Sequence, residues 1–585
     1  MQTYREEYKN WLGAPCLSEE ERADLAAIEN DKKQQEDRFY TELEFGTAGL
    51  RGVLGLGTNR MNTYVVRRAT AGLADYLLNL TGEEEGAAAH GVAIAYDSRR
   101  CSALFAEVSA RTLAAYGIKS FLYSTLHSVP QLSFTVRELG CIAGIVITAS
   151  HNPPEYNGYK VYWSHGGQCG PAQADEILAS IRNFGYFDTK IMDFEEAKAK
   201  GLITMIGEDV DEIYYKKTMS VMLNPELVRA EAAKMSEGIV YSPLHGSGRV
   251  PVTAILDRIG IKNLYVVAEQ EEPDGDFPTV KAPNPEDPNA FKLAMELGKK
   301  VNAGLLFATD PDSDRLGVAV RKKDGEYRVL TGNQIGSILI YYILSELKAQ
   351  GRLPEDGFVV KSLVSTSLAD VICRSFNIEI RHVLTGFRFI AEQIDLAETT
   401  GKGRFLFGFE ESYGFLSGGF AHDKDAVLAA MLVVEAAIVY ASRGKGLIDV
   451  LEEIYEKFGY FIEKTKSYTL TGKEGIEKIA SAMAALRKEP PTAFGEKEPI
   501  LIREDFSKNE RIDCANGTEG EIGLPKSNVL RYFLPDDAWV VVRPSGTEPK
   551  LKLYVGAKAG DEAAATERMN AIMAAGDAIV SALLK

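Results

Sequence analysis

Three aspartates recur at alternate positions in one short segment of the sequence. The segment Thr309-Asp-Pro-Asp-Ser-Asp-Arg315 follows an apolar run and holds Asp310, Asp312 and Asp314. A tight turn of this kind can aim several oxygens at one cation, and hard oxygen ligands favour Mg²⁺ or Ca²⁺. A calcium EF-hand does not fit, because arginine stands where that loop needs glycine and again where it needs glutamate. The alternative is a solvated acidic turn.

Ser150 is a candidate nucleophile. It follows the buried run Cys141-Ile-Ala-Gly-Ile-Val-Ile-Thr148 and precedes His151, Asn152 and two prolines. A serine beside a metal ion can carry a phosphoryl group, whose charge of about −1.5 to −2 the cation would partly neutralise. A helix N-cap or a turn serine is the alternative reading of this position.

Two further clusters have groups that bind polar ligands. The segment Arg543-Pro-Ser-Gly-Thr-Glu-Pro-Lys550 combines a guanidinium, two hydroxyls, a glycine and a lysine, which are phosphate-binding groups. Its alternative is a polar turn before a strand. The triplet Glu410-Glu-Ser412 can hydrogen-bond to sugar hydroxyls, and a solvated loop is the alternative there.

Several common catalytic motifs do not occur in the sequence. We find no G-x-S-x-G elbow, no H-E-x-x-H, no Walker A loop and no G-x-G-x-x-G. The classes that lose support are serine esterases, zincins, nucleoside triphosphatases and dinucleotide enzymes. The seven histidines show no metal-ligand spacing, so we interpret them as structural.

The elements that must position these residues are short apolar runs alternating with amphipathic stretches. This pattern is typical of parallel strands covered by helices, so the fold class is α/β. The strands we expect are 91–96, 141–148, 238–241, 303–308, 404–407 and 538–542, and the helices include 425–442 and 447–458. Ligands of open α/β sheets bind beyond the carboxyl ends of the strands, where the polar clusters fall. We therefore expect one shared cleft.

Composition narrows the class of protein. The chain has 585 residues and a net charge of −17, which argues against a general nucleic-acid binder. No apolar run approaches a membrane span and the N-terminus does not resemble a signal peptide, so we expect no membrane partner and a cytoplasmic location. Six scattered cysteines without a Cys-x-x-Cys pair suit reduced thiols.

Changes in sequence texture suggest domain boundaries. They fall near the acidic stretch 207–212, near Lys322-Lys-Asp-Gly325 and near Glu463-Lys-Thr-Lys466. The chain after residue 460 shows less strand–helix alternation, so we expect a smaller α+β domain there. The resulting prediction is four domains, over residues 1–212, 213–324, 325–460 and 461–585, the first three α/β.

Taken together, the clusters resemble the α-D-phosphohexomutase family, and within it the phosphoglucomutase branch. The motifs that carry the resemblance occur in the family's order over nearly the whole chain: Phe45-Gly-Thr-Ala-Gly-Leu-Arg-Gly52, Thr148-Ala-Ser-His-Asn-Pro153, Asp310-Pro-Asp-Ser-Asp-Arg315, Glu410-Glu-Ser412 and Arg543-Pro-Ser-Gly-Thr547. The resemblance implies four domains around a central cleft, three α/β mixed-sheet domains and a smaller C-terminal α+β domain.

The resemblance also implies roles for individual residues. Ser150 resembles the serine that is phosphorylated in the active enzyme, and it would share a Mg²⁺ ion with Asp310, Asp312 and Asp314. Arg51 and Arg315 match active-site arginines, while Lys160 and His151 are alternatives for handling the hydroxyl proton. The positions that match substrate-binding loops are Glu410, Ser412, Arg388, Lys424, Arg543, Ser545, Gly546 and Thr547.

The sequence departs from the family pattern at two of these places. Arg388 stands where many glucose-type members have lysine, so it keeps the charge but not the point geometry or the easily shifted pKa. Phe409 occupies the place of a glycine that often precedes the Glu-Glu-Ser triplet.

The activity that the resemblance implies is a phosphoglucomutase reaction through a phosphoserine enzyme. Glucose 1-phosphate and glucose 6-phosphate would interconvert, with glucose 1,6-bisphosphate as the intermediate and activator. The alternatives are a pentose or mannose phosphomutase of the same family, a Mg²⁺-dependent sugar-phosphate hydrolase, and a silent sugar-phosphate sensor. The sensor is disfavoured because it needs no nucleophile beside a metal.

Overall fold

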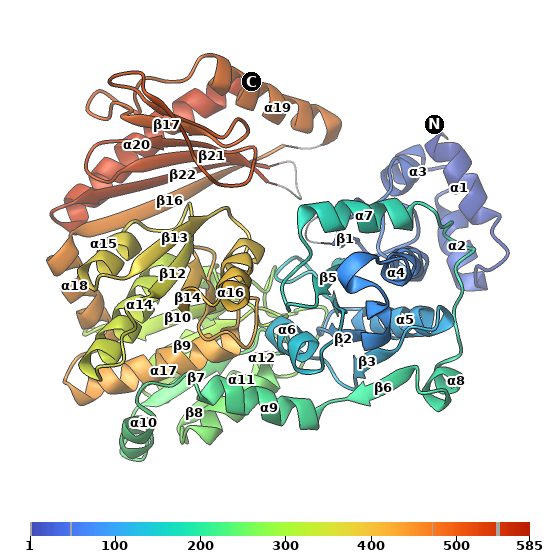
Figure 1. Cartoon of the computed structure of the whole chain (residues 1–585), viewed down its shortest axis with the longest axis horizontal. Helices are drawn as coiled ribbons and strands as arrows, with labels where there is room; N and C mark the ends of the chain where they lie inside the picture. Colours follow the sequence, from blue (N-terminus) through green and yellow to red (C-terminus); the bar gives the residue numbers. More distant parts are fainter. Residues whose placement is uncertain (1–2, 47–48, 471, 546–549) are drawn as a thin grey trace. The chain divides into compact units, whose positions relative to one another are not determined.

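The computed structural model describes residues 3–46, 49–470, 472–545 and 550–585. The chain forms two compact units (Figure 1). The first contains the chain up to residue 332 together with residues 391–401 and 412–442, and the second contains 333–390, 402–411 and 443–585.

The first unit opens with a six-stranded mixed sheet in the order β1-β5-β4-β2-β3-β6. Its centre is parallel, whereas β1 and β5 run antiparallel to their neighbours. The central strands are rich in Val and Ile and buried along their length, as expected of strands covered on both faces. The strands are β1 (Leu50–Val53), β2 (Val92–Tyr96), β3 (Ser120–Tyr123), β4 (Ala143–Ile147), β5 (Tyr156–Trp163) and β6 (Ile203–Ile206).

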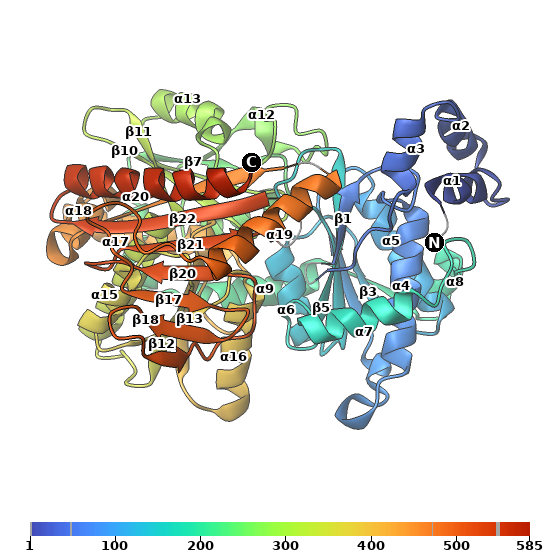
Figure 2. The same ribbon diagram turned by 90° about the horizontal axis from the view of Figure 1, so that it is seen from above.

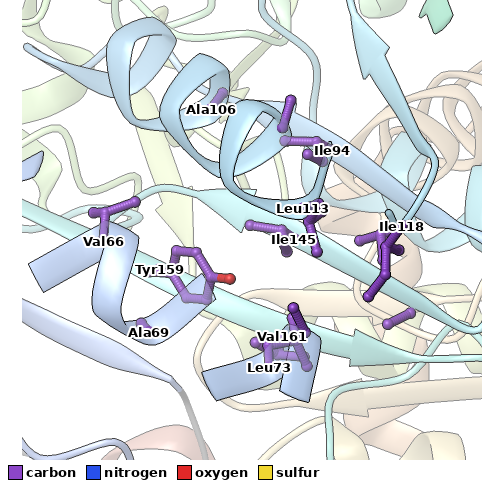
Figure 3. Packing of buried hydrophobic residues seen from close by; sticks show 14 of the residues in the cluster. Val66, Ala69, Leu73, Ile94, Ala106, Leu113, Ile118, Ile145, Tyr159 and Val161 are labelled. Atoms are coloured by element: carbon purple, nitrogen blue, oxygen red, sulfur yellow. The ribbon is translucent and has the colours of Figure 1, made fainter. Parts of the chain in front are cut away.

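Helices cover both faces of this sheet. Apolar side chains of α4, α5 and α7 pack into one core with those of the strands (Figure 3). Helix α6 contacts β2, β4 and β5, and Figure 2 shows the strands between α6 and α5. The helices are α4 (Thr63–Leu78), α5 (Ser102–Ala115), α6 (Val129–Glu138), α7 (Pro171–Ile181) and α8 (Phe194–Ala199).

Three short helices precede this sheet and pack around a second core, which they share with Tyr64 of α4 and with Phe187. Trp11 is fully buried there, with its ring against those of Phe39, Tyr64 and Phe187. They are α1 (Tyr4–Leu12), α2 (Glu19–Ala27) and α3 (Lys32–Phe39).

The second sheet of the first unit has the order β11-β10-β9-β7-β8. Strands β8, β7 and β9 are parallel, and β9, β10 and β11 form an antiparallel meander. Its strands are β7 (Gly238–Ser242), β8 (Leu264–Val266), β9 (Ala303–Thr309), β10 (Leu316–Arg321) and β11 (Tyr327–Leu330). The helices of this part are α9 (Glu208–Met219), α10 (Pro225–Ala232), α11 (Arg249–Arg258), α12 (Ala268–Glu271) and α13 (Lys292–Lys300).

A later helix, α17 (Ala426–Ser442), also belongs to the first unit, and strand β15 (Gly414–Leu416) precedes it. Helix α17 is apolar all round and almost entirely buried, and it contacts α10 and α11. A helix without a polar face is stable only inside a core, which explains this position.

The second unit begins with a parallel arrangement in which β12 (Gly357–Ser362) lies between β13 (Glu379–Val383) and β14 (Arg404–Glu410). The helices α14 (Gly332–Ala349), α15 (Leu368–Ser375) and α18 (Leu447–Phe458) belong to this part of the chain. Helix α16 (Arg388–Thr400) starts in the second unit, and its residues from 391 onward belong to the first.

The unit ends in a seven-stranded antiparallel sheet of order β16-β22-β21-β20-β17-β18-β19. Helix α20 packs along β22 and β16, beside α19 (Figure 2). The elements are β16 (Tyr460–Thr469), β17 (Ile502–Asp505), β18 (Glu510–Asp513), β19 (Glu519–Glu521), β20 (Leu530–Phe533), β21 (Trp539–Pro544), β22 (Lys550–Ala559), α19 (Gly472–Lys488) and α20 (Glu562–Leu583).

The predicted fold class is confirmed, with three α/β parts and a smaller antiparallel α+β part. Two texture changes that we interpreted as boundaries fall inside sheets, and the predicted domain limits stay a prediction. Glu463–Lys466 lies within β16, whose backbone pairs antiparallel with β22. Lys322–Gly325 is the turn of the β10–β11 hairpin, so the second sheet continues to Leu330.

All six cysteines are free thiols, and no single helix in the described part of the chain has the length and apolarity of a membrane span.

Candidate active site

Ser150 lies in the turn between β4 and β5 with a backbone that few serines adopt. Its φ is 52°, in the left-handed region that is strained for a residue with a side chain. The Oγ atom of Thr148 accepts the Ser150 N–H at 2.8 Å, and the Ser150 hydroxyl donates to Asp310 at 2.7 Å. The turn therefore points the hydroxyl at the aspartate cluster.

Arg99, three residues after the end of β2, binds the backbone of this turn. Its guanidinium donates to the carbonyls of Ser150 (2.5 Å), Asn152, Pro153 (2.9 Å) and Tyr156 (3.0 Å). Arg99 is only 3% exposed, and Asp97, at 3.4 Å, supplies a countercharge. One buried fork thus satisfies four backbone carbonyls of the serine loop.

A glycine allows strands β1, β4 and β5 to approach closely next to this loop. A Cβ at Gly158 of β5 would lie 2.5 Å from the Thr148 carbonyl and 2.8 Å from that of Leu50. Strand β5 can therefore lie between β1 and β4 only with glycine at that position.

The three aspartates lie together in the loop between β9 and β10. All are buried, and one carboxylate oxygen of each lies within 4.8 Å of the other two. Ser247 fixes the loop by donating both its N–H and its hydroxyl to the Pro311 carbonyl, each at 2.8 Å. The carbonyl of Asp312 also accepts the N–H of Val129, the first residue of α6, at 2.9 Å.

Burial and mutual repulsion shape the ionisation of this trio. Burial, with the charges of Asp312 and Asp314, raises the pKa of Asp310 well above its ordinary value. Burial and Asp312 likewise raise the pKa of Asp314. Burial opposes ionisation of Asp312 as well, but the charges of Lys160 and Lys424, together with the hydrogen bonds that Asp312 shares with Lys160 and Asp310, lower that pKa. Three close carboxylates without a cation are therefore unfavourable.

Two lysines neutralise part of this charge, and both bind Oδ2 atoms. Lys160 of β5 donates to Oδ2 of Asp312 at 3.0 Å, and Nζ of Lys424 lies 3.1 Å from Oδ2 of Asp314. The Oδ1 atoms of Asp312 and Asp314 are buried and have no hydrogen-bond partner among the described residues. Buried carboxylate oxygens without a hydrogen-bond donor, on aspartates that lie this close together, fit a hard divalent cation.

Lys424 is held by its neighbour in sequence. Its ammonium donates to Asp423 at 2.9 Å, and the other oxygen of Asp423 accepts from Tyr162 at 2.6 Å and Gln168 at 3.0 Å. The structure thus brings Lys424, which the resemblance assigned to substrate binding, onto the aspartate loop.

His151 and Arg51 lie at the serine loop, Arg315 lies beside Asp314, and Ser412 lies in the turn after β14. Nδ1 of His151 lies 3.1 Å from the serine Oγ, and Arg51 of β1 donates to Asn152 at 3.4 Å. Arg315 pairs with Glu286, and its Nε lies 3.8 Å from Asp314. Burial and the charges of Arg315 and Arg51 lower the pKa of His151 well below its ordinary value, so the imidazole is neutral at pH 7. Ser412 is half-buried in the turn after β14.

The second unit brings other candidates together. Glu410 is the last residue of β14 rather than a loop residue, because the strand extends beyond the predicted end at Phe407. Its carboxylate accepts the N–H of Gly386 at 2.7 Å, which places it on the turn that leads into Arg388, the first residue of α16. This turn needs glycine at 386, where φ is +119°.

Arg543 is the last residue but one of β21 and donates to the Tyr554 hydroxyl of β22 at 3.3 Å. The Ser545 N–H donates to the Lys550 carbonyl at 2.7 Å. Gly546 and Thr547 lie outside the described residues. The predicted single cleft for both groups of residues stays a prediction.

Sequence reasoning missed several residues with specific contacts. Asp97 and Arg99 lie in the polar segment Asp97-Ser-Arg-Arg100 after β2, and nothing in its sequence distinguishes Arg99 from its exposed neighbour Arg100. Glu411, which we grouped with its neighbours as a ligand of sugar hydroxyls, accepts instead from the Ser362 hydroxyl of β12 at 2.8 Å. Burial and the charge of Glu410 raise the pKa of Glu411.

Comparison with known proteins agrees with this arrangement. Four models of the phosphoglucomutase/phosphomannomutase family match in order: α/β/α domain I at residues 42–185, domain II at 214–325, domain III at 331–458 and the C-terminal domain at 503–574. The phosphoglucomutase of Staphylococcus epidermidis RP62A is 36% identical over 547 residues, covering 93% of this chain and 96% of that protein. That of Staphylococcus aureus MRSA252 is 37% identical over 542 residues, or 92% and 94%.

Two solved structures share the fold. The open form of pp63/parafusin, a phosphoglucomutase of Paramecium, has a TM-score of 0.66 at 15% identity and covers 92% of this chain and 96% of its own. A phosphoglucomutase/phosphomannomutase family protein of Burkholderia thailandensis has a TM-score of 0.61 at 18% identity, over 92% and 97%. Fold and site thus define an α/β enzyme of four domains. The chain belongs to the phosphoglucomutase/phosphomannomutase family.

Proposed function

We propose that the chain is a phosphoglucomutase that interconverts glucose 1-phosphate and glucose 6-phosphate. The observation that carries this proposal is Ser150, a strained serine whose hydroxyl donates to Asp310 within three converging buried aspartates. Relatives named phosphoglucomutase along nearly the whole chain favour glucose as the sugar.

The residues fit a reversible phosphoryl transfer. Phosphorylated Ser150 donates to the free hydroxyl of the sugar monophosphate: the Oγ–P bond breaks, a sugar O–P bond forms, and the sugar hydroxyl proton passes through a base to the serine oxygen. The bisphosphate then returns its other phosphate to Ser150, and the serine proton passes through the base to the sugar oxygen from which that phosphate leaves. The net result is an isomerised sugar phosphate.

We assign a Mg²⁺ ion to Asp310, Asp312 and Asp314, with Ser150 contributing through its phosphoryl group. When bound, the ion supplies positive charge that stabilises the transferring phosphoryl group. Arg51 and Arg315 add charge beside the serine, while Arg99 fixes its loop.

Two groups are candidates for the proton transfer. His151 is neutral and 3.1 Å from the serine oxygen, whereas Lys160 contacts Asp312. Substrate recognition is assigned to Glu410, Ser412 and Lys424 for the sugar, and to Arg543, Ser545, Gly546 and Thr547 for the phosphate that does not react. For Arg388 we assign only a positive charge near the substrate.

The test is turnover of glucose 1-phosphate with Mg²⁺, read through glucose-6-phosphate dehydrogenase, with and without a trace of glucose 1,6-bisphosphate. We expect turnover that the bisphosphate stimulates and that Ser150→Ala abolishes, together with one phosphate per chain by intact mass. Turnover only with ribose, deoxyribose or mannose phosphates would move the substrate within the family. Release of inorganic phosphate without isomerisation would identify a hydrolase instead.

A further inference from the structure

A second cluster of side chains with metal-ligating chemistry lies in the first unit and shares no residue with the aspartate loop. One ring nitrogen of His165, one of His422 and a carboxylate oxygen of Asp395 lie within 4.8 Å of one another. The three come from the turn after β5, from the segment before α17 and from α16. Asp395 follows His165 by 230 residues, and His422 follows Asp395 by 27 residues, which is why no sequence pattern indicated the cluster.

His422 is the central observation. It is 1% exposed, and its Nε2 has no hydrogen-bond partner among the described residues. A buried imidazole nitrogen without a partner is costly unless it meets a ligand. The nearby carboxylate of Glu398 is 3.6 Å from this nitrogen, which is too far for a hydrogen bond.

Glu398 adds a fourth group to the cluster. It follows Asp395 by three residues on α16, so both carboxylates lie on the same side of the helix. His165 and Asp395 are half-buried, which leaves a route for an ion from solvent. Two imidazoles and two carboxylates suit a borderline divalent metal such as Zn²⁺, whereas Mg²⁺ prefers oxygen ligands alone.

We propose that His165, Asp395 and His422, with Glu398 as the fourth ligand, bind a divalent transition-metal ion of the Zn²⁺ type. The ion links the turn after β5, the helix α16 segment 391–400 and the chain just before α17. This site shares no residue with the phosphoryl-transfer residues, although Asp423 and Lys424 directly follow His422, and it does not depend on the proposed function.

The hydrogen bonds of the two Nδ1 atoms set the affinity. Gly167 N–H donates to His165 Nδ1 at 3.0 Å, and Arg137 Nη1 lies 3.3 Å from His422 Nδ1. In the metal-free protein each neutral ring therefore carries its proton on Nε2. When Nε2 binds a metal ion the proton moves to Nδ1, where it faces an N–H donor, so binding has to displace these contacts.

Arg137 is consequently a competitor of the ion. Its other nitrogen donates to Glu398 at 2.9 Å, and its positive charge repels a cation. We expect reversible binding that is weaker than that of a closed structural zinc site.

The experiment titrates the full-length protein with Co²⁺ in the presence of saturating Mg²⁺, which occupies the aspartate loop. The readout is the visible d–d absorption of Co²⁺, followed by competition with Zn²⁺. We expect one equivalent with imidazole coordination, and at least roughly tenfold weaker binding in His165→Gln and His422→Gln. His90→Gln, at an exposed histidine, is the matched control and should bind as the unmodified protein does.

Arg137→Gln gives a result in the opposite direction. A glutamine oxygen can accept from Nδ1–H and carries no charge, so this variant should bind Co²⁺ roughly tenfold more tightly. Far-ultraviolet circular dichroism checks each fold, and if His422→Gln unfolds, His165→Gln and Arg137→Gln decide. Binding that is unchanged in His165→Gln, or unchanged in Arg137→Gln, overturns the proposed coordination. Because the readout is absorption and not turnover, it stands apart from the test of mutase activity.

Discussion

Arg99 determines the position of Ser150 by binding the Ser150 backbone and not the Ser150 side chain. Its guanidinium donates to the Ser150 carbonyl at 2.5 Å and to three further carbonyls of the same loop. A turn with φ of 52° at the candidate nucleophile leaves these carbonyls without partners in a regular element. The buried Arg99 guanidinium takes the place of the water molecules that these carbonyls would otherwise need as hydrogen-bond donors.

Arg99→Lys should therefore impair catalysis more than folding. Lysine keeps the charge but reaches fewer of the four carbonyls, so the serine loop loses its defined position. We expect kcat to fall roughly 10- to 100-fold, because small misplacements of reacting groups reduce rates by about this factor. The measurement is initial rate together with a thermal melt, with Arg100→Lys on the exposed neighbour as control. Equal kcat for Arg99→Lys and Arg100→Lys would refute the role of Arg99.

Two substitutions at Ser150 separate chemistry from backbone strain. Ser150→Ala and Ser150→Gly should both lack the phosphate and be inactive. Glycine adopts positive φ without the steric cost of a Cβ, so Ser150→Gly should be more stable than Ser150→Ala by about 1 kcal/mol. Denaturant unfolding of the two variants gives the difference. Equal stability would mean that the loop relaxes when the serine hydroxyl is removed.

Asp310→Asn should abolish Mg²⁺ binding and make the metal-free protein more stable. Burial and two neighbouring carboxylates raise the pKa of Asp310, so its charge is unfavourable in the metal-free protein. Asparagine can still accept the N–H groups of Asp314 and Arg315 and donate to Ser150. In EDTA we expect a gain of about 1–3 kcal/mol.

The measurement is the thermal melt of Asp310→Asn with EDTA and with Mg²⁺. Mg²⁺ should raise the Tm of the unmodified protein and leave that of the variant unchanged. Asp324→Asn, on the exposed turn of the β10–β11 hairpin, is the control and should behave as the unmodified protein. A variant that Mg²⁺ still stabilises would place the cation elsewhere.

Much of the fold was predictable because local signals are strong in buried strands. The runs before Ser150 and before Asp310 became β4 and β9, and the polar segments after them meet at one site. Boundaries were less predictable. Glu463–Lys466 has the charged composition that we interpreted as a boundary, yet an antiparallel strand at a sheet edge is open to solvent and tolerates charged residues. Only pairing with β22 distinguishes the two, and pairing is a tertiary property.

The chemistry-bearing residues of the site were predictable, but their supports were not. Ser150 and the three aspartates stand out by type and spacing. Arg99 and Asp423 act through contacts with residues tens to hundreds of positions away, and their neighbours in sequence look equally polar. The cluster of His165 and His422 was missed for the same reason, since the nearby Asp395 comes from a third segment.

Asp425 should make stability fall as pH rises through the weakly acidic range. Burial raises its pKa to about 6, above the ordinary 3.8. Between these values the folded protein holds a proton that the unfolded chain has released, so its stabilising effect is full below pH 3.8 and lost above pH 6. The total is about 3 kcal/mol at most.

Asp425→Asn removes this titration. The Tm of the variant minus that of the unmodified protein should increase from pH 4.5 to pH 7. Tyr214→Phe removes the hydroxyl that donates to both oxygens of Asp425, at 2.9 and 2.8 Å, and should extend the loss of stability to higher pH. A Tm difference that does not change with pH would show that Asp425 titrates normally.

Arg543→Ala should weaken the binding of substrate with little change in kcat. Arg543 is assigned to the phosphate that does not react, which is held in the ground state and the transition state alike, so its loss raises KM. We expect KM for glucose 1-phosphate to rise roughly 10- to 100-fold, and by less in Arg543→Lys, which keeps the charge without the fork. Tyr554→Phe removes only the hydroxyl that accepts from Arg543 and serves as the control, with a small increase. If Arg543→Ala lowers kcat and leaves KM unchanged, the residue acts on the transferring phosphoryl group instead.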